Sequence, residues 1–229
     1  MGQQLNQGFI GSLLRLRADG ADLVRGLYLK AVTAKQPPAS QVLATRYRMV
    51  FAVDIVGYSK LTAWQQQKYH RRLHDVIEEV LLDLLLTLPG NDRKDTGDGW
   101  IIFLPVELDP TRALPTLIRA TAARISADNS TESPRLRLRL AIGMGLVVPG
   151  PGIFSGAAVV EVVRLLECAA IRREICEHPT TDLAVIVSDR LYSDIAGIGN
   201  SGIPADRFHR VRAVAKGFDQ IAWLWRAAG

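Results

Sequence analysis

The stretch "MVFAVDIVGYSKLT", residues 49–62, places one acidic side chain inside an apolar run. Met49–Ile55 has the composition of a buried strand, yet it contains Asp54. A carboxylate is rarely buried unless it is paired with a cation or bound to a metal. We therefore expect another part of the chain to bring a partner for Asp54 to the end of this strand.

A second acidic residue lies in the turn of a predicted hairpin. The segment "PGNDRKDTGDGWIIFLP", residues 89–105, contains the turn "TGDG" followed by a predicted strand over Trp100–Leu104. If this hairpin pairs beside Met49–Ile55, then Asp98 in the turn and Asp54 converge at one edge of the sheet. Two such carboxylates suit Mg²⁺ or Mn²⁺, which prefer oxygen ligands and often share them with substrate phosphates.

The remaining apolar patterns predict an α+β fold. Helical periodicity predicts helices over about 60–86, 111–127 and 157–176, and a short helix over 188–195 with Ser188 as N-cap. Alternating or continuous apolar runs predict strands over 135–148, 183–188, 208–214 and 220–225, with a loop over 149–156. This order indicates a ferredoxin-like sandwich, in which helices pack on one mostly antiparallel sheet.

Length and composition fit one main domain with an N-terminal extension. Residues 1–41 have helically spaced apolar residues among Arg and Lys and end in a proline-containing linker, so they are predicted to be a helical extension. Residues 42–229 carry the patterns of the main domain. We expect the extension to pack on its own domain or on a second copy, with docking to a partner or to an acidic membrane surface as the alternative.

Charge and hydropathy limit the classes of partner. The formal net charge is +5, but the basic residues are scattered and form none of the common nucleic-acid-binding patterns. No apolar run reaches the length of a membrane span, and the N-terminus lacks the pattern of a signal peptide. We therefore expect a cytoplasmic protein with no nucleic-acid partner and no membrane partner other than the acidic surface to which the extension could dock.

Five segments together resemble the catalytic domain of the class III nucleotidyl cyclases, the adenylate and guanylate cyclase family. They are "FAVDIVGYSKLT" (51–62), "KDTGDGWIIFL" (94–104), "RLRLAIGMGLVV" (137–148), "SGAAVVEVVRLLECA" (155–169) and "VAKGFDQIAWLW" (214–225). The resemblance covers about residues 45–227, and the first two segments are the most specific. It implies the α+β sandwich of that family and conversion of a nucleoside triphosphate to its 3′,5′-cyclic monophosphate.

The resemblance also implies a two-metal site. It makes Asp54, Asp98 and the backbone carbonyl of Ile55 the ligands of two Mg²⁺ or Mn²⁺ ions. The implied reaction is attack of the substrate's 3′-hydroxyl on its own α-phosphorus while pyrophosphate leaves in line. Positioning and charge neutralisation would carry most of this catalysis.

Three basic residues are given roles by the same resemblance. Lys94 corresponds to the residue that reads the base, Arg164 to the one that stabilises the transition state, and Lys216 to the one that binds the terminal phosphates. In the family, each site lies between two domains arranged head to tail. A chain with one such domain is therefore expected to act as a homodimer with two equivalent sites.

Four positions depart from the family pattern. Ile153 stands where adenylate cyclases have a purine-reading aspartate, and Tyr58 where the family often has phenylalanine close to the nucleotide. Val160 replaces the family's asparagine, and Leu146 replaces a phosphate-binding arginine of some members. Ile153 cannot accept a hydrogen bond from an adenine amino group, whereas Lys94 can donate to a carbonyl oxygen, which uracil, cytosine and guanine all offer; the further narrowing to a pyrimidine rests on the bulk of Tyr58.

A compact cyclase domain with "GYS" after the first aspartate most resembles the stand-alone bacterial pyrimidine cyclases of Pycsar anti-phage defence. This implies that the chain converts UTP or CTP to cyclic UMP or cyclic CMP, and that a separate effector protein senses the product. Two alternatives stay open. One is a purine cyclase that reads its base differently, and the other is a cyclase-like domain that binds a nucleotide or a partner without catalysis, which Val160 and Leu146 favour.

Overall fold

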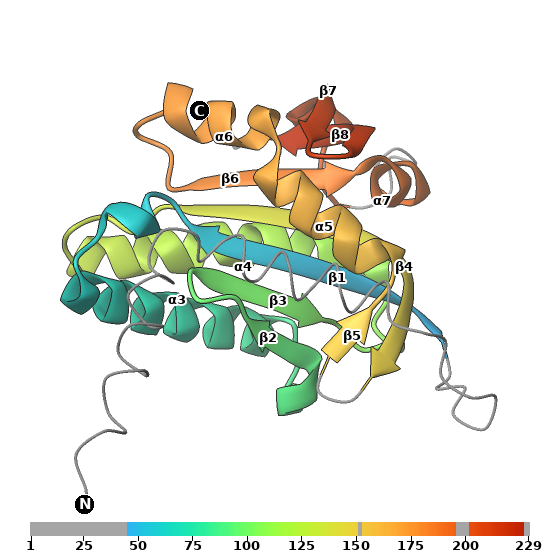
Figure 1. Ribbon diagram of the computed structural model, residues 1–229, viewed down its shortest axis with the longest axis horizontal. Coiled ribbons are helices and arrows are strands. Elements are labelled where there is room, and N and C mark those ends of the chain that lie inside the picture. The colour runs from blue at the N-terminus through green and yellow to red at the C-terminus, as the bar shows by residue number, and fades with distance from the viewer. Residues whose placement is uncertain (1–44, 151–152, 196–201, 227–229) are drawn as a thin grey trace, which may run out of the picture. The chain divides into compact units, whose positions relative to one another are not determined.

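The computed structural model describes residues 45–150, 153–195 and 202–226. These residues form an eight-stranded sheet with helices packed on both of its faces (Figure 1). All but one of the strand pairings are antiparallel, so the predicted α+β fold with a mostly antiparallel sheet is confirmed. The helical extension predicted over 1–41 lies outside the described residues. None of the described helices is both long and apolar enough to cross a membrane.

The sheet has the strand order β2–β3–β1–β4–β6–β8–β7, and β5 pairs with the end of β4. The parallel neighbours are β4 and β6. The strands are β1 (Arg46–Ile55), β2 (Arg93–Asp95), β3 (Gly99–Phe103), β4 (Leu138–Gly150), β5 (Ile153–Ser155), β6 (Leu183–Ser188), β7 (Phe208–Ala215) and β8 (Phe218–Trp225). The strand β1, which carries Asp54, therefore has a hydrogen-bonded neighbour on each side.

Two predicted segments differ from the structure. The helices are α3 (Ala63–Asp83), α4 (Pro110–Thr131), α5 (Ala157–Glu167), α6 (Ala169–Glu177) and α7 (Asp189–Asp194). The single helix predicted over 157–176 is thus two helices, because the backbone of Cys168 is extended and ends α5. Both helices bury one side, so the apolar pattern continues across the break. The loop predicted over 149–156 contains β5, which pairs with 148–150.

The two faces of the sheet carry different side chains. On β1, Met49, Phe51, Val53 and Ile55 belong to the main apolar core, which α3 and α4 cover. Successive side chains of a strand alternate, so Asp54 points to the opposite face. On that face α5 packs against β4 and β1 (Figure 1). Asp54 is therefore separated from the main core by the sheet itself.

A buried arginine ties α3 to α4 on the core face. Arg72 of α3 donates hydrogen bonds to both carboxylate oxygens of Asp128 at 2.6–3.2 Å. It also donates to the side chain of Asn129 and to the carbonyl oxygen of Pro134. Arg72 is only 5% exposed. Because its donors are used by several fixed acceptors, we interpret this ion pair as structural.

Candidate active site

The end of β1 brings Asp54 next to the β2–β3 hairpin. Asp54 is opposite Gly99 of β3 on one side and opposite Arg139 of β4 on the other. The backbone N–H of Ile55 donates to the carbonyl oxygen of Asp98 at 3.0 Å. The hairpin thus pairs beside β1, as predicted, and holds Asp98 at the end of the strand that carries Asp54.

Two glycines shape the turn that carries Asp98. Gly97 has a φ of +90°, a backbone conformation that L side chains rarely adopt. A Cβ on Gly99 would lie 1.9 Å from the carbonyl oxygen of Val53, so only glycine lets β3 run this close to β1. As a result, the exposed Asp98 sits beside the buried Asp54.

Arg139 is a partner of Asp54 that the sequence analysis missed. Its Nε donates to one carboxylate oxygen of Asp54 at 2.8 Å, and its Nη2 donates to the other at 2.5 Å. The side chains of Asp54 and Arg139 are 12% and 14% exposed. Burial raises the pKa of Asp54 to about 6, an effect that Arg139 opposes and Asp98 reinforces. The partner of the buried Asp54 carboxylate within the chain is therefore the Arg139 guanidinium on the neighbouring strand β4.

A sequence signal for this pair does exist. In "RLRLRL", the leucines at 136, 138 and 140 are fully buried, so the arginines between them face the side of the sheet that carries Asp54. Arg137 on this face donates to backbone carbonyls. The leucine pattern predicts correctly which face of the sheet the arginines lie on. Which arginine meets Asp54 depends on the register between β1 and β4, which places Arg139 opposite Asp54.

The described residues supply two carboxylates as candidate ligands for divalent cations. Asp54 and Asp98 offer two carboxylates at one edge, the ligand type that Mg²⁺ and Mn²⁺ take. No three His, Cys, Asp or Glu side chains gather into a metal-holding group in the part of the chain that the structure describes. Both oxygens of Asp54 already accept hydrogen bonds from Arg139, which occupies part of their lone-pair capacity.

The structure places Lys94 on the same face of the sheet as Asp54. Lys94 of β2 is opposite Ile101 of β3, and Ile101 is opposite Ala52 of β1. Cross-strand partners share a face, and Ala52 lies two residues before Asp54. Burial lowers the pKa of the Lys94 ammonium group.

Tyr58 lies on the other side, in the short 3-10 helix Tyr58–Lys60 that follows β1. Its ring packs against the main core and, with Trp100, lines an open groove of about 690 Å³ along α3. The rings of His70 and His74 lie against Trp100, with centroids 5.8 and 6.0 Å away. Burial, together with the charge of the nearby hairpin acids, raises the pKa of Tyr58. Tyr58 is thus close to the hairpin turn but separated from Lys94 by the sheet.

Arg164 is held by its own helix. It lies near the end of α5, and its Nη1 is 2.9 Å from a carboxylate oxygen of Glu167, one turn further along. Among the described residues, the cationic side chains whose charge lowers the pKa of Asp54 are Arg139 and Arg172. The structure therefore brings Asp54 and Asp98 together but does not pair Arg164 with either of them.

Lys216 and Ile153 lie far from Asp54 of the same chain. Lys216 is in the β7–β8 turn at the far edge of the sheet. Across the sheet, Asp54 is opposite Arg139, and Arg139 is opposite Ala184 near the start of β6. The start of β6 pairs with the last residues of β8, at the end of β8 that is remote from Lys216. Because the eight residues of β8 rise about 3.3 Å each, Lys216 lies roughly 25 Å away along the strand direction. Ile153 pairs with Gly150, at the end of β4 remote from Asp54.

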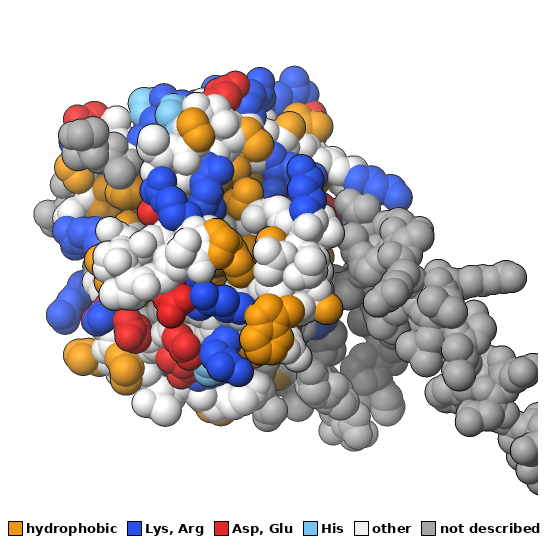
Figure 2. Space-filling view, turned by 90° about the vertical axis from the view of Figure 1, so that its left-hand side faces the viewer, with side chains coloured by type: hydrophobic (Ala, Val, Ile, Leu, Met, Phe, Trp, Pro, Cys, Tyr) orange, Lys and Arg blue, Asp and Glu red, His pale blue; other side chains and the backbone are white. Residues whose placement is uncertain are grey.

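Charges of both signs meet at the end of the molecule where β1 ends. Figure 2 shows this end: Lys and Arg side chains are spread over the face, and a group of Asp and Glu side chains lies among them. Basic side chains can attract an anionic ligand, and carboxylates are the ligand type that a divalent ion takes, so this end carries both kinds of group.

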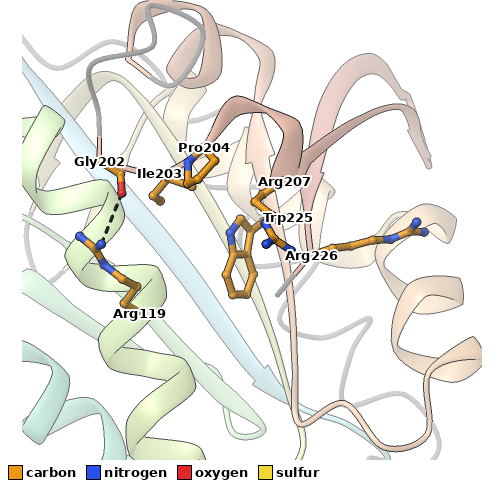
Figure 3. Close-up of a pocket in the computed structure, with 7 residues that line it drawn as sticks. All are labelled: Arg119, Gly202, Ile203, Pro204, Arg207, Trp225 and Arg226. Atoms are coloured by element: carbon orange, nitrogen blue, oxygen red, sulfur yellow. Dashed lines mark hydrogen bonds between the residues drawn. The ribbon is translucent and has the colours of Figure 1, made fainter. Parts of the chain in front are cut away.

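A separate pocket of about 200 Å³ lies on the α4 side of the sheet (Figure 3). Arg119 of α4 donates to the carbonyl oxygen of Gly202 at 3.3 Å across it, and Arg207 and Trp225 form the opposite wall. None of the predicted site residues lines this pocket, and it lies on the face of the sheet opposite to Asp54. It is therefore not part of the candidate site.

Comparison with solved structures identifies the fold. The chain is similar to the guanylyl cyclase Cya2 (TM-score 0.55, 15% identity, 80% of this chain and 91% of that chain). It is similar to the adenylyl cyclase CyaB from P. aeruginosa (TM-score 0.55, 17% identity, 81% and 98%). It is also similar to the guanylate cyclase domain of RhGC from Catenaria anguillulae in complex with GTP (TM-score 0.55, 13% identity, 81% and 100%).

These similarities establish that the chain has the fold of the class III adenylyl and guanylyl cyclase domains. Sequence comparison adds nothing to this result: no protein-family profile matches the chain, and no curated protein matches it. The predicted resemblance is therefore supported at the level of the cyclase fold.

Proposed function

We propose that this chain is a nucleotidyl cyclase that forms a 3′,5′-cyclic monophosphate and pyrophosphate from a nucleoside triphosphate. One observation carries the proposal: Asp54 and Asp98 are held side by side at the end of β1, in a fold whose solved examples include adenylyl and guanylyl cyclases. The basic side chains around this end support it.

The proposed chemistry asks the protein mainly to position and to neutralise charge. The 3′-oxygen forms a bond to the α-phosphorus, the bond from that phosphorus to pyrophosphate breaks, and the hydroxyl proton passes to solvent. Divalent Mg²⁺ or Mn²⁺, of which the resemblance implies two per site on Asp54, Asp98 and the Ile55 carbonyl, would supply charge neutralisation and lower the pKa of the 3′-hydroxyl. Arg164 would bind the α-phosphate through its planar guanidinium, and Lys216 would bind the terminal phosphates.

We propose that the complete site forms only between two copies of the chain. Lys216 is roughly 25 Å from Asp54 along the strand direction, and Arg164 is ion-paired within its own helix. A head-to-tail homodimer would bring the Asp54 end of one copy to Lys94, Arg164 and Lys216 of the other. Two-fold symmetry would then create two equivalent sites.

For the substrate we propose a pyrimidine nucleotide, UTP or CTP. Ile153 supplies an apolar side chain where a purine-reading acid would be needed, and the Lys94 ammonium group pairs with a carbonyl oxygen of the base. The resemblance implies that Tyr58 lies close to the nucleotide and narrows the space for the base; because the sheet separates Tyr58 from Lys94 within one chain, the two side chains would come from different copies. In keeping with the resemblance to Pycsar cyclases, the product would be a second messenger that a separate effector senses in bacterial anti-phage defence.

Product analysis tests the function and the base together. Purified protein is incubated with Mn²⁺ and equal ATP, GTP, CTP and UTP, and cyclic nucleotides are measured by mass spectrometry. We expect cyclic UMP or cyclic CMP from the wild type and from Asp75→Asn, which alters an exposed helix carboxylate, and none from Asp54→Ala. A cyclic purine would keep the enzyme and overturn the choice of base.

The absence of any product from folded, dimeric protein would favour the second candidate, a cyclase-like domain that binds a nucleotide without catalysis. The observation that favours this candidate is the bidentate hold of Arg139 on Asp54, together with Val160 in place of the family's asparagine. Equilibrium binding of a triphosphate without turnover would then be the expected behaviour.

A further inference from the structure

The hairpin that carries Asp98 begins with a short edge strand. β2 has three residues, lies at one end of the strand order, and pairs with β3 alone among the described strands. Successive side chains of a strand alternate, so Arg93 and Asp95 point to one face of the sheet and Lys94 points to the other. Because one side of β2 has no neighbouring strand, side chains that contact β2 matter for the turn that follows it.

Two side chains of α3 contact the two ends of β2. Glu78 forms an ion pair with Arg93, the first residue of the strand. About two helical turns earlier on α3, Nε2 of His70 lies 3.2 Å from Oδ2 of Asp95, the last residue of the strand. This distance is within the range of N–H···O hydrogen bonds. Of the two contacts, the one made by His70 is next to the turn.

The other carboxylate oxygen of Asp95 shapes the turn itself. Oδ1 of Asp95 accepts a hydrogen bond from the backbone N–H of Gly97 at 2.7 Å, which closes a turn across Thr96. Asp98 follows directly, and its Oδ1 accepts a hydrogen bond from the Thr96 hydroxyl at 3.3 Å. A chain of contacts therefore runs from His70 through Asp95 and the turn to the Asp98 carboxylate.

His74, one turn further along α3, shows what is particular to His70. Both imidazole rings lie against Trp100, with centroid separations of 5.8 Å for His70 and 6.0 Å for His74. Within the described residues, His70 contacts an acidic side chain and His74 has no such contact. The packing against Trp100 is thus common to the two histidines, and the contact with Asp95 distinguishes His70.

We infer that His70 is a positioning residue for Asp98: through Asp95 it holds the β2–β3 turn in the conformation that presents the Asp98 carboxylate to divalent ions. The inference rests on the proposed function, because Asp98 is a metal ligand only in the proposed site. His70 lies on the α3 face of the sheet, opposite to the face of Asp54, so it acts through the turn and not by coordinating an ion itself.

Two measurements on the full-length protein test this role. Hydrogen exchange of the Gly97 amide, followed by NMR in metal-free protein, reports the bond to Asp95. Titration with Mn²⁺ alone, followed by electron paramagnetic resonance, reports the Kd for the metal. His70→Phe keeps a ring against Trp100 and removes both nitrogens. We expect exchange to become faster and the Kd to rise, each by about three- to fivefold, the size expected when a partly exposed ionic contact is lost.

Two further variants separate this contact from the packing of the ring. His74→Phe makes the same change one helical turn along and should leave both values near those of the wild type. His70→Gln should restore both values toward the wild type, because its amide nitrogen can take the place of Nε2 and donate to Asp95. If His70→Phe does not fold, His70→Ala removes the same contact without adding bulk and gives the same test.

Several results would overturn the inference. One is unchanged Gly97 exchange in the folded His70 variant, and another is equal acceleration of exchange in His74→Phe. Faster exchange with an unchanged Kd for Mn²⁺ would overturn it as well, because the turn would then not set the affinity of the metal site.

Failure of this inference is distinguishable from failure of the proposed function. A cyclic product from the wild type, with unchanged exchange and Kd in His70→Phe, would discard the role of His70 and keep the cyclase. Faster exchange and weaker Mn²⁺ binding in His70→Phe, without any cyclic product from the wild type, would keep the role of His70 and discard the catalytic activity. Absence of Mn²⁺ binding to the wild type would discard both.

Discussion

The Arg139–Asp54 pair and the Arg72–Asp128 pair have similar geometry but different surroundings. Both guanidinium groups bind both oxygens of an aspartate, and both lie in largely buried positions. Arg72 also satisfies an amide oxygen and a backbone carbonyl, whereas the hydrogen bonds of Arg139 to described residues go to Asp54 alone.

The surroundings of the two aspartates also differ. Asp128 belongs to a helix–helix contact on the core face, while Asp54 faces α5 with a second acid, Asp98, beside it. Because Arg72 also bonds other groups of the fold, breaking its pair with Asp128 would leave a buried charge and acceptors without their donor. An ion pair that ends next to another carboxylate at a sheet edge is placed where a cation can bind. The comparison teaches that position and neighbours, rather than pair geometry, separate the structural pair from the candidate site.

The largest expected effect comes from Asp98→Asn compared with Asp128→Asn. Asp98→Asn removes a proposed metal ligand and should lower kcat by about 10³-fold or more, since several kcal/mol of charge stabilisation is lost. Its melting temperature should stay near that of the wild type because Asp98 is exposed. Asp128→Asn should lower the melting temperature and leave kcat of the folded protein near that of the wild type. Steady-state rates and thermal melts check both variants. Equal loss of activity per folded molecule in the two variants would contradict the distinction between the candidate site and the structural pair.

The next effect concerns the division of the site between two copies. Arg164→Ala should lower kcat by about 10²–10³-fold, the loss typical of a group that stabilises transition-state charge. Mixing Arg164→Ala with Asp54→Ala should restore roughly a quarter of wild-type activity, because half of the dimers then contain one intact site. Activity that stays at the level of the single variants, with subunit exchange demonstrated by mass spectrometry, would argue against a shared site.

Arg72→Met should act on stability alone. Removing Arg72 leaves Asp128 with a buried charge and takes donors from Asn129 and Pro134. Loss of one partner of a buried pair costs about 3–5 kcal/mol, so the urea midpoint should fall strongly. kcat of the folded fraction should be unchanged. A loss below about 1 kcal/mol would show that this pair is not the structural contact that we describe.

The smallest effect is a pH dependence of stability from Glu161. Burial raises the pKa of this α5 carboxyl from 4.5 to about 7, against the opposing charge of Arg190. Its contribution to stability is therefore full below pH 4.5 and is lost as pH rises through about 7. After discounting for partial exposure, this amounts to about 2 kcal/mol at most.

Glu161→Gln removes this titration. Urea unfolding measured from pH 4.5 to pH 8 should show a smaller decrease of stability in Glu161→Gln than in the wild type. Glu79→Gln, which alters an exposed carboxyl on α3, should keep the wild-type slope. Parallel wild-type and Glu161→Gln curves would contradict the assignment of the shift to burial of Glu161.

The sequence by itself determined the fold class and the pair of aspartates. Alternation of leucines marked one buried face of a strand, glycines marked the hairpin turn, and a carboxylate in the apolar run 49–55 marked a site. These are local properties, which depend on the period of each element and on the conformations that each residue allows. The break at Cys168 was missed because an apolar pattern reports which side is buried, not whether the axis bends.

Only the tertiary structure decided that Arg139 holds Asp54, that Lys94 shares its face, and that Lys216 and Ile153 lie far from it. These relations depend on strand order and register, and a shift of one residue would turn every side chain of a strand to the other face. Residues 85 positions apart meet because β1 and β4 are neighbours. No periodicity within either segment contains that information, since register is fixed by the packing of the whole sheet.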